Sequence, residues 1–165
     1  MHIGKKNNRH NYSMIIDNTN HQLRAVTEEK DLGVTIDEML KFQAQHTSVV
    51  NRGHRMTGVI KRSFEHLDKK TFNLLYKALV RPILEYTIPA YSPYQKKDMD
   101  SYEKVQRRAT KLVPTLKDSS YQQRMLQLKL PSLSYRRSRG DMITVYNCLH
   151  GNYRINSERL IPQNH

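Results

Sequence analysis

The chain has little of several residue types, and each shortage excludes a class of protein. Of its 165 residues only Cys148 is a cysteine, and none is a tryptophan. A single cysteine cannot form an internal disulfide or a Cys-x-x-Cys motif, which excludes a disulfide scaffold and argues against zinc. The same shortage is typical of a reducing compartment, so we expect a nuclear or cytoplasmic protein. No apolar run approaches the roughly 18 residues of a membrane span, so no membrane partner is expected.

The sequence also lacks the motifs of catalysis and of cofactor binding. It has no adjacent Asp-Asp pair, which polymerases use to hold divalent metal ions, and no glycine-rich phosphate loop. Asp98-x-Asp100 could bind a metal ion, but these carboxylates stand where acidic residues stabilise the start of a helix. The eight histidines form no cluster with the cysteine. We therefore predict no catalytic residue, no metal site and no cofactor.

What the sequence does have is positive charge, and its distribution is uneven. The formal net charge is +13 at pH 7. Residues 1–40 hold five basic and six acidic side chains, whereas residues 41–165 hold 23 basic and nine acidic ones. A positive excess in one part of a chain indicates a polyanionic partner, and nucleic acid is the most abundant polyanion. The alternative is a solvated basic surface without a specific partner.

The spacing of apolar residues divides the chain into a strand-like and a helical part. Alternating or β-branched segments between turn residues predict strands at 13–17, 23–26 and 30–36. After these, apolar residues recur with helical spacing. The expected fold is α+β and mostly α, with short N-terminal strands or a hairpin followed by a bundle of about five helices. The expected domains are a β segment at 1–37, a helical domain at 38–150 and a tail at 151–165.

Capping residues predict where several helices begin. Asp68 precedes a strongly amphipathic helix that Pro82 should kink, because proline lacks an N–H and crowds the preceding turn. Ser119 and Gln122 predict a capping box, and Ser132 opens the last helix. The buried stripe expected after Asp68 is Phe72, Leu75, Tyr76, Leu79, Ile83 and Leu84. The buried stripe expected after Ser132 is Tyr135, Met142, Val145, Tyr146 and Leu149.

The helix predicted over residues 98–113 carries a basic row opposite its apolar side. The row consists of Lys104, Arg107, Arg108 and Lys111. The row is about 10 Å long by helix rise. Its side chains are spaced comparably to the phosphates of a duplex, so the row can follow one strand. Few acidic residues interleave, so salt bridging along the helix does not explain the row. A solvated surface is the competing interpretation. Further candidate contacts are Lys61, Arg62, Arg136, Arg137 and Arg139.

Three segments, taken in order, resemble a known family. They are EKDLGVTID at 29–37, LLYKALVRPILEY at 74–86 and LPSLSYRRSRGDM at 130–142. Together they resemble the carboxy-terminal part of the reverse transcriptase of a jockey-like non-LTR retrotransposon, and the resemblance covers nearly the whole chain. It implies that residues 1–5 are the last palm strand and that Leu32 and Gly33 belong to the primer-grip hairpin. It also implies that the helices form the thumb and the region beyond it.

The chain departs from that family in what it lacks. The fingers, most of the palm and the catalytic Asp-Asp hairpin are absent, and Pro89-Ala90 stands where family members often have Val-Trp. The resemblance therefore implies a truncated RNA-directed DNA polymerase, inactive by itself, whose primer-grip residues Leu32 and Gly33 and basic helix faces contact an RNA–DNA or DNA duplex. The missing palm and fingers would be a further partner within a longer protein. The alternative hypothesis is a helical protein-interaction module or a transposon remnant without function.

Overall fold

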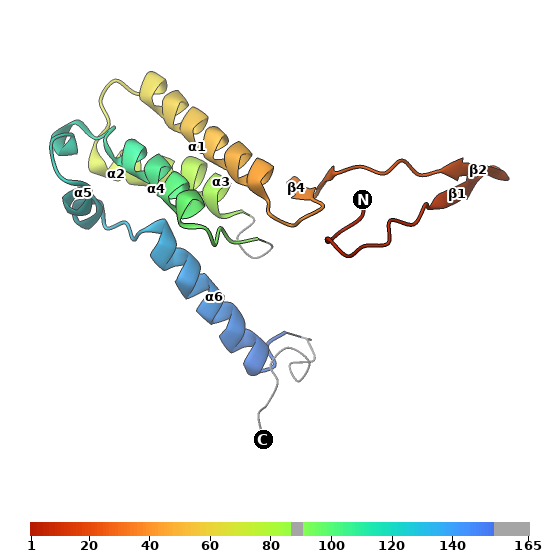
Figure 1. The fold of residues 1–165 in the computed structure, drawn as a ribbon. Coiled ribbons are helices and arrows are strands. Elements are labelled where there is room, and N and C mark those ends of the chain that lie inside the picture. The colour runs from red at the N-terminus through yellow and green to blue at the C-terminus, as the bar shows by residue number, and fades with distance from the viewer. Residues whose placement is uncertain (87–90, 154–165) are drawn as a thin grey trace. The chain divides into compact units, whose positions relative to one another are not determined.

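The computed structural model describes residues 1–86 and 91–153, and the chain divides into two compact units, Met1–Asn51 and Arg52–His165. Within the described ranges, antiparallel hairpins precede a set of helices (Figure 1). The fold is therefore α+β and mostly α, as the sequence predicts. The boundary between the units falls inside helix α1 (Gln43–Ser63). Most of the predicted tail, at 154–165, and the Pro89-Ala90 pair lie outside the described residues.

The first unit contains two short hairpins, each built around a two-residue turn. The pairs are β1 (Ser13–Ile16) with β2 (Thr19–Gln22) and β3 (Glu28–Asp31) with β4 (Val34–Asp37). Asp17 and Asn18 turn the first hairpin with φ of 50° and 58°, and Leu32 and Gly33 turn the second with 47° and 81°. Positive φ at both central residues gives a turn whose twist matches that of the flanking strands.

Several strand predictions for this unit are wrong. Residues 23–26 and 1–5 form no strand, and the single strand predicted over 30–36 is two strands joined at Leu32 and Gly33. Leu32 is 84% exposed, whereas Val34 is buried. The error arose because Leu32, Val34 and Ile36 keep a period of two across the turn. An alternating pattern therefore looks the same in a continuous strand and in a tight hairpin.

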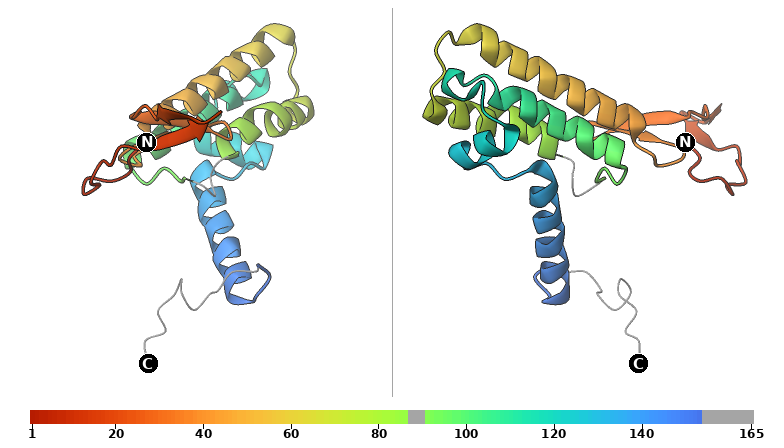
Figure 2. Two further views of the ribbon diagram at one scale, coloured as in Figure 1. Left: turned by 90° about the vertical axis from the view of Figure 1, so that its right-hand side faces the viewer. Right: turned by 60° about the vertical axis from the view of Figure 1, so that its left-hand side comes forward.

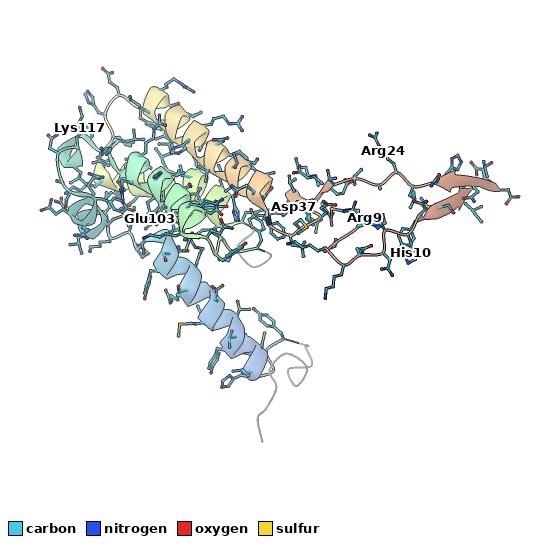
Figure 3. The ribbon with its side chains drawn as sticks, in the orientation of Figure 1. Arg9, His10, Arg24, Asp37, Glu103 and Lys117 are labelled. Carbon is cyan, nitrogen blue, oxygen red and sulfur yellow. The ribbon has the colours of Figure 1, made fainter. Side chains whose placement is uncertain are left out.

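Asp37 ends β4 and orders the loop before α1 (Figure 3). Its carboxylate accepts backbone hydrogen bonds from Met39 at 3.0 Å, Lys41 at 3.1 Å and Phe42 at 2.6 Å. Burial alone would raise the pKa of this carboxyl, but the backbone N–H donors outweigh burial and hold the pKa below its ordinary value. The loop is thus closed around an ionised side chain.

We expect residues 1–36 to be the least stable part of the described chain. Every residue of β1, β2 and β3 is exposed, and each hairpin is a separate two-stranded sheet. Such sheets are marginally stable in water, and their edge N–H groups exchange readily. Native-state hydrogen exchange should therefore be fast in 1–36 and slow in the helical residues between 69 and 128. Equal protection of the two ranges would contradict this expectation.

The second unit is helical. Beyond α1, its helical elements are α2 (Lys69–Leu75), the π-helical turn η1 (Tyr76–Val80), α3 (Arg81–Glu85), α4 (Lys96–Thr110), the 3-10 turn η2 (Pro114–Leu116), α5 (Tyr121–Leu128) and α6 (Leu133–Leu149) (Figure 2). Asp68 caps α2 and Ser132 caps α6, which confirms both predictions. The capping box of α5 pairs Ser120 with Gln123, one residue later than predicted.

A π-helical turn precedes Pro82 in the continuous helix from α2 to α3. Arg81 donates its N–H to the carbonyl of Tyr76, five residues back. Pro82 has no N–H to donate, and its ring would crowd an α-helical carbonyl four residues earlier, so a wider turn accommodates it. The buried residues of this helix are Phe72, Tyr76, Val80 and Leu84, each at most 3% exposed. The prediction that Leu79 is buried is wrong, because the π turn changes the spacing of the stripe to four.

Gly53 allows α1 to approach its neighbours closely. A Cβ at this position would lie 3.0 Å from a methyl group of Leu84 and 3.0 Å from one of Val105. These distances are tighter than ordinary van der Waals contacts, so a larger residue would require Leu84, Val105 or α1 itself to shift. The glycine therefore sets the spacing between α1 and the helix that carries the predicted basic row.

The apolar stripe predicted for α6 is not buried. Its residues, Tyr135, Met142, Val145, Tyr146 and Leu149, are between 50% and 73% exposed. The buried residues of α6 are instead Leu133 and Arg137, near its start, and the helix leads away from α4 and α5 (Figures 1 and 2). Helical spacing shows which residues share a face, but it does not show whether another element covers that face.

Candidate nucleic-acid interface

The predicted basic row lies on one exposed side of α4. Its members, Lys104, Arg107, Arg108 and Lys111, are all exposed, and we call them the α4 basic face. On the other side of the helix Tyr102, Val105 and Ala109 are at most 2% exposed. No described carboxylate forms an ion pair with any of the four basic residues. Their positive charge is therefore available to an external anion.

A cavity of about 720 Å³ continues this surface toward the end of α1. Lys61 comes from the last turn of α1, Arg108 comes from α4, Lys111 is the C-cap residue of α4, and Lys117 comes from the loop before α5. The acidic residues of the lining are Glu65 and Asp118. Four basic side chains from three segments thus surround one hollow.

A second cavity, of about 590 Å³, lies between the end of α4 and the first turn of α5. Arg107, Lys111, Lys117 and Arg124 line it. Asp118 is the acidic residue of this lining. Lys111, Lys117 and Asp118 line both cavities, so the two hollows adjoin at these residues. Figure 3 shows Lys117 on the loop ahead of α5.

Tyr121 fixes the direction in which Arg107 points. The Cζ atom of Arg107 lies 4.9 Å from the centre of the Tyr121 ring. The Tyr121 hydroxyl donates to the carboxylate of Glu103 and accepts from Nε2 of Gln106 at 3.2 Å. Burial raises the pKa of Tyr121, and the hydrogen bond to Glu103 raises it further, so the phenol stays protonated. A cation over such a held ring is worth about 0.5–1 kcal/mol at an exposed site.

The pKa of His54 depends on the charge of the α4 basic face. Its Nδ1 atom is buried and has no hydrogen-bond partner among the described residues. Burial lowers the pKa of the imidazole, and the positive charge of Arg108 lowers it further. An anion beside Arg108 would reduce this repulsion, so the pKa of His54 should rise when the face is occupied.

The structure gives two of the predicted contacts internal roles. Arg136 forms a bidentate ion pair with Glu85, with nitrogen–oxygen distances of 2.5 and 2.9 Å. Arg137 is 5% exposed, and its guanidinium lies 5.8 Å from the centre of the Tyr102 ring. Burial lowers the pKa of Arg137. Because these side chains attach α6 to α3 and α4, we exclude them from the candidate interface.

The remaining predicted contacts are not among the residues that line the two cavities. Arg62 and Arg139 are exposed but line neither hollow. The primer-grip-like pair, Leu32 and Gly33, forms the β3–β4 turn of the first unit. The structure thus concentrates the candidate interface on α4, Lys61 and Lys117.

Sequence reasoning missed Lys117 and Arg124. Both lie outside the helical row that drew attention to α4, and Arg124 resembles any other polar residue of a short helix. A signal for Lys117 was present, because Pro114 ends one helix and a serine cap opens the next within a few residues. So short a connection returns the chain to the end of α4.

The described residues contain no candidate metal centre. Among residues 1–86 and 91–153, no group of three His, Cys, Asp or Glu side chains could hold a metal ion. In the same ranges no helix combines the length and the apolar content that crossing a bilayer requires.

Comparisons with models of known protein families, with curated proteins and with solved structures find no match to this chain.

Proposed function

We propose that this chain binds the phosphate backbone of a nucleic-acid duplex, as a thumb-derived fragment of a non-LTR reverse transcriptase without catalytic carboxylates. The α4 basic face carries the proposal, because its four exposed cations share one side of a helix and have no carboxylate partner in the described chain. The resemblance at 29–37, 74–86 and 130–142 favours an RNA–DNA or DNA duplex as the partner.

The chemistry of the face favours contacts that position a duplex without reading its sequence. Phosphate contacts fix the register of a protein on a duplex, whereas base edges carry the sequence information. Lys61 and Lys117 line the 720 Å³ cavity together with Lys111 and so widen the basic surface, and the Tyr121 ring holds Arg107 in place. We therefore expect similar affinity for duplexes of different sequence.

Replacing Arg107 and Arg108 with glutamine should weaken duplex binding on every sequence. Each lost phosphate contact should also reduce the slope of log affinity against log salt by about 0.9, because fewer counterions are released. Fluorescence anisotropy with a labelled random-sequence duplex, measured over a series of salt concentrations, tests both effects. Glutamine retains helix propensity, so circular dichroism should show an unchanged fold.

The matched control is the double variant Arg52→Gln and Arg55→Gln on α1. Both arginines are exposed, and neither lines either cavity, so the control removes the same charge but should retain the salt slope. An NMR titration of His54 gives a second readout, since duplex binding at Arg108 should raise its pKa. A folded Arg107/Arg108 variant with the affinity and salt slope of the original protein would reject the proposal.

A second candidate function, a protein-interaction module, is favoured by the exposed apolar residues of α6. Met142 is 73% exposed and Tyr146 is 56% exposed. Contiguous exposed apolar residues often mark interaction surfaces. This function does not require duplex binding that weakens with salt, so the anisotropy experiment separates it from the proposed one.

A further inference from the structure

Arg124 is a buried cation whose charge no described carboxylate balances. Its side chain is 3% exposed. Its Nε donates to the Thr110 hydroxyl at 3.0 Å and its Nη1 donates to the Ser119 carbonyl, both of them neutral acceptors. No ion pair of the described chain includes Arg124. A buried charge without a counterion is costly, and this one lines the 590 Å³ cavity. An anion in that cavity would offset the cost.

Other donors line the same cavity. Arg107, Lys111 and Lys117 bring the total to four cations, against the single carboxylate of Asp118. The cavity also includes the first turn of α5, whose capping box uses the N–H groups of Ser120 and Gln123.

At the start of α5 the capping box leaves two backbone N–H donors without an acceptor in the helix. The N–H groups of Tyr121 and Gln122 have no acceptor within α5, because they belong to its first turn. Free N–H groups and the helix dipole at such a position favour phosphate. Side chains and backbone therefore favour the same kind of ligand.

We propose that this cavity binds the terminal phosphate of a nucleic-acid strand, while the α4 basic face holds the diester phosphates that follow. The inference rests on the proposed function. A terminal phosphomonoester carries close to two negative charges near pH 7, whereas a diester carries one, so four cations and one carboxylate suit the monoester better. Arg107 and Lys111 belong to both surfaces, so a strand that ends in the cavity continues directly onto α4.

The test compares blunt duplexes of one sequence that carry 5′-phosphates, 3′-phosphates or only hydroxyl ends. The protein should bind one of the phosphorylated duplexes on the order of tenfold more tightly than the hydroxyl-ended duplex, as expected for new hydrogen bonds to a charged group. Inorganic phosphate alone should shift the amide NMR signals of Tyr121 and Gln122.

Lys117→Gln is the main variant, because Lys117 is exposed and lies outside every helix. It should reduce the preference for a phosphorylated end to about threefold or less, whereas hydroxyl-ended binding should weaken only by the smaller factor expected for one of several backbone contacts. Arg124→Lys is the second variant. It keeps the charge but loses the planar fork, and it should also reduce the preference.

The outcomes separate this inference from the proposed function. Equal affinity for all three duplexes, with steep salt dependence, would overturn the strand-end site and leave backbone binding in place. A preference that neither Lys117→Gln nor Arg124→Lys reduces would overturn the placement of the site in this cavity. Failure of every duplex to bind would overturn the proposed function and the strand-end site together.

Discussion

Val105→Asp is expected to unfold the helical unit. Val105 is 0% exposed, and its methyl groups face the backbone of α1 at Gly53. An aspartate at this position would bury a carboxylate without a partner, and buried unpaired charges cost several kcal/mol. A loss of about 4 kcal/mol or more is a large fraction of the stability of a small domain. Thermal and urea denaturation followed by circular dichroism measures it.

Lys104→Asp is the matched control for this experiment. It introduces the same residue one position earlier on α4, but Lys104 is exposed. The control should cost no more than about 1 kcal/mol, from helix propensity and altered surface charge. Similar losses in the two variants would contradict the assignment of the buried side of α4.

Removing the carboxylate of Glu103 should give the second largest loss of stability. Glu103 lies on α4 (Figure 3). It accepts a hydrogen bond from the Tyr121 hydroxyl and another from the backbone N–H of Leu133 at 3.1 Å. It therefore joins α4 both to α5 and to the start of α6. Glu103→Ala leaves two partly buried donors without this acceptor, and we expect a loss of about 2–4 kcal/mol in the free energy of unfolding.

Asp100→Ala is the control for Glu103→Ala, since Asp100 is an exposed carboxylate on the same helix. Chemical denaturation of the two variants should differ by at least about 1.5 kcal/mol. Tyrosine fluorescence or the NMR signals of Tyr121 should change only in Glu103→Ala. Equal denaturation midpoints would show that the Glu103 hydrogen bonds contribute no net stability.

The sequence predicts the helical part of this fold better than the strand part, for identifiable reasons. Asp68 and Ser132 cap helices as predicted, because an N-cap is a local interaction between neighbouring residues. The capping box of α5 was misplaced by one residue because serines and glutamines both occur in adjacent pairs, at 119–120 and 122–123. Local patterns decide such features only when one arrangement is possible.

The site was partly predictable for the same reason. The exposure of Lys104 and Arg108 follows from their place opposite an apolar stripe on one helix. The internal role of Arg136 does not follow from local sequence, because its partner Glu85 lies 51 positions away. A basic residue near a helix start looks the same in sequence whether it faces solvent or an acidic partner elsewhere in the chain.

The π-helical turn at Tyr76–Val80 allows the helix from α2 to α3 to differ in length by one residue without changing its buried face. Phe72 and Leu84 are both buried although they are 12 residues apart, a spacing that a regular α-helix rotates by roughly 120°. At a spacing of 11, the same rotation is only about 20°. The wide turn therefore accommodates one residue more than a regular α-helix would have over the same length. A relative that lacks one residue here and lacks Pro82 could form an ordinary α-helix and present the same face, so the gap in its alignment to this chain should fall between Tyr76 and Val80.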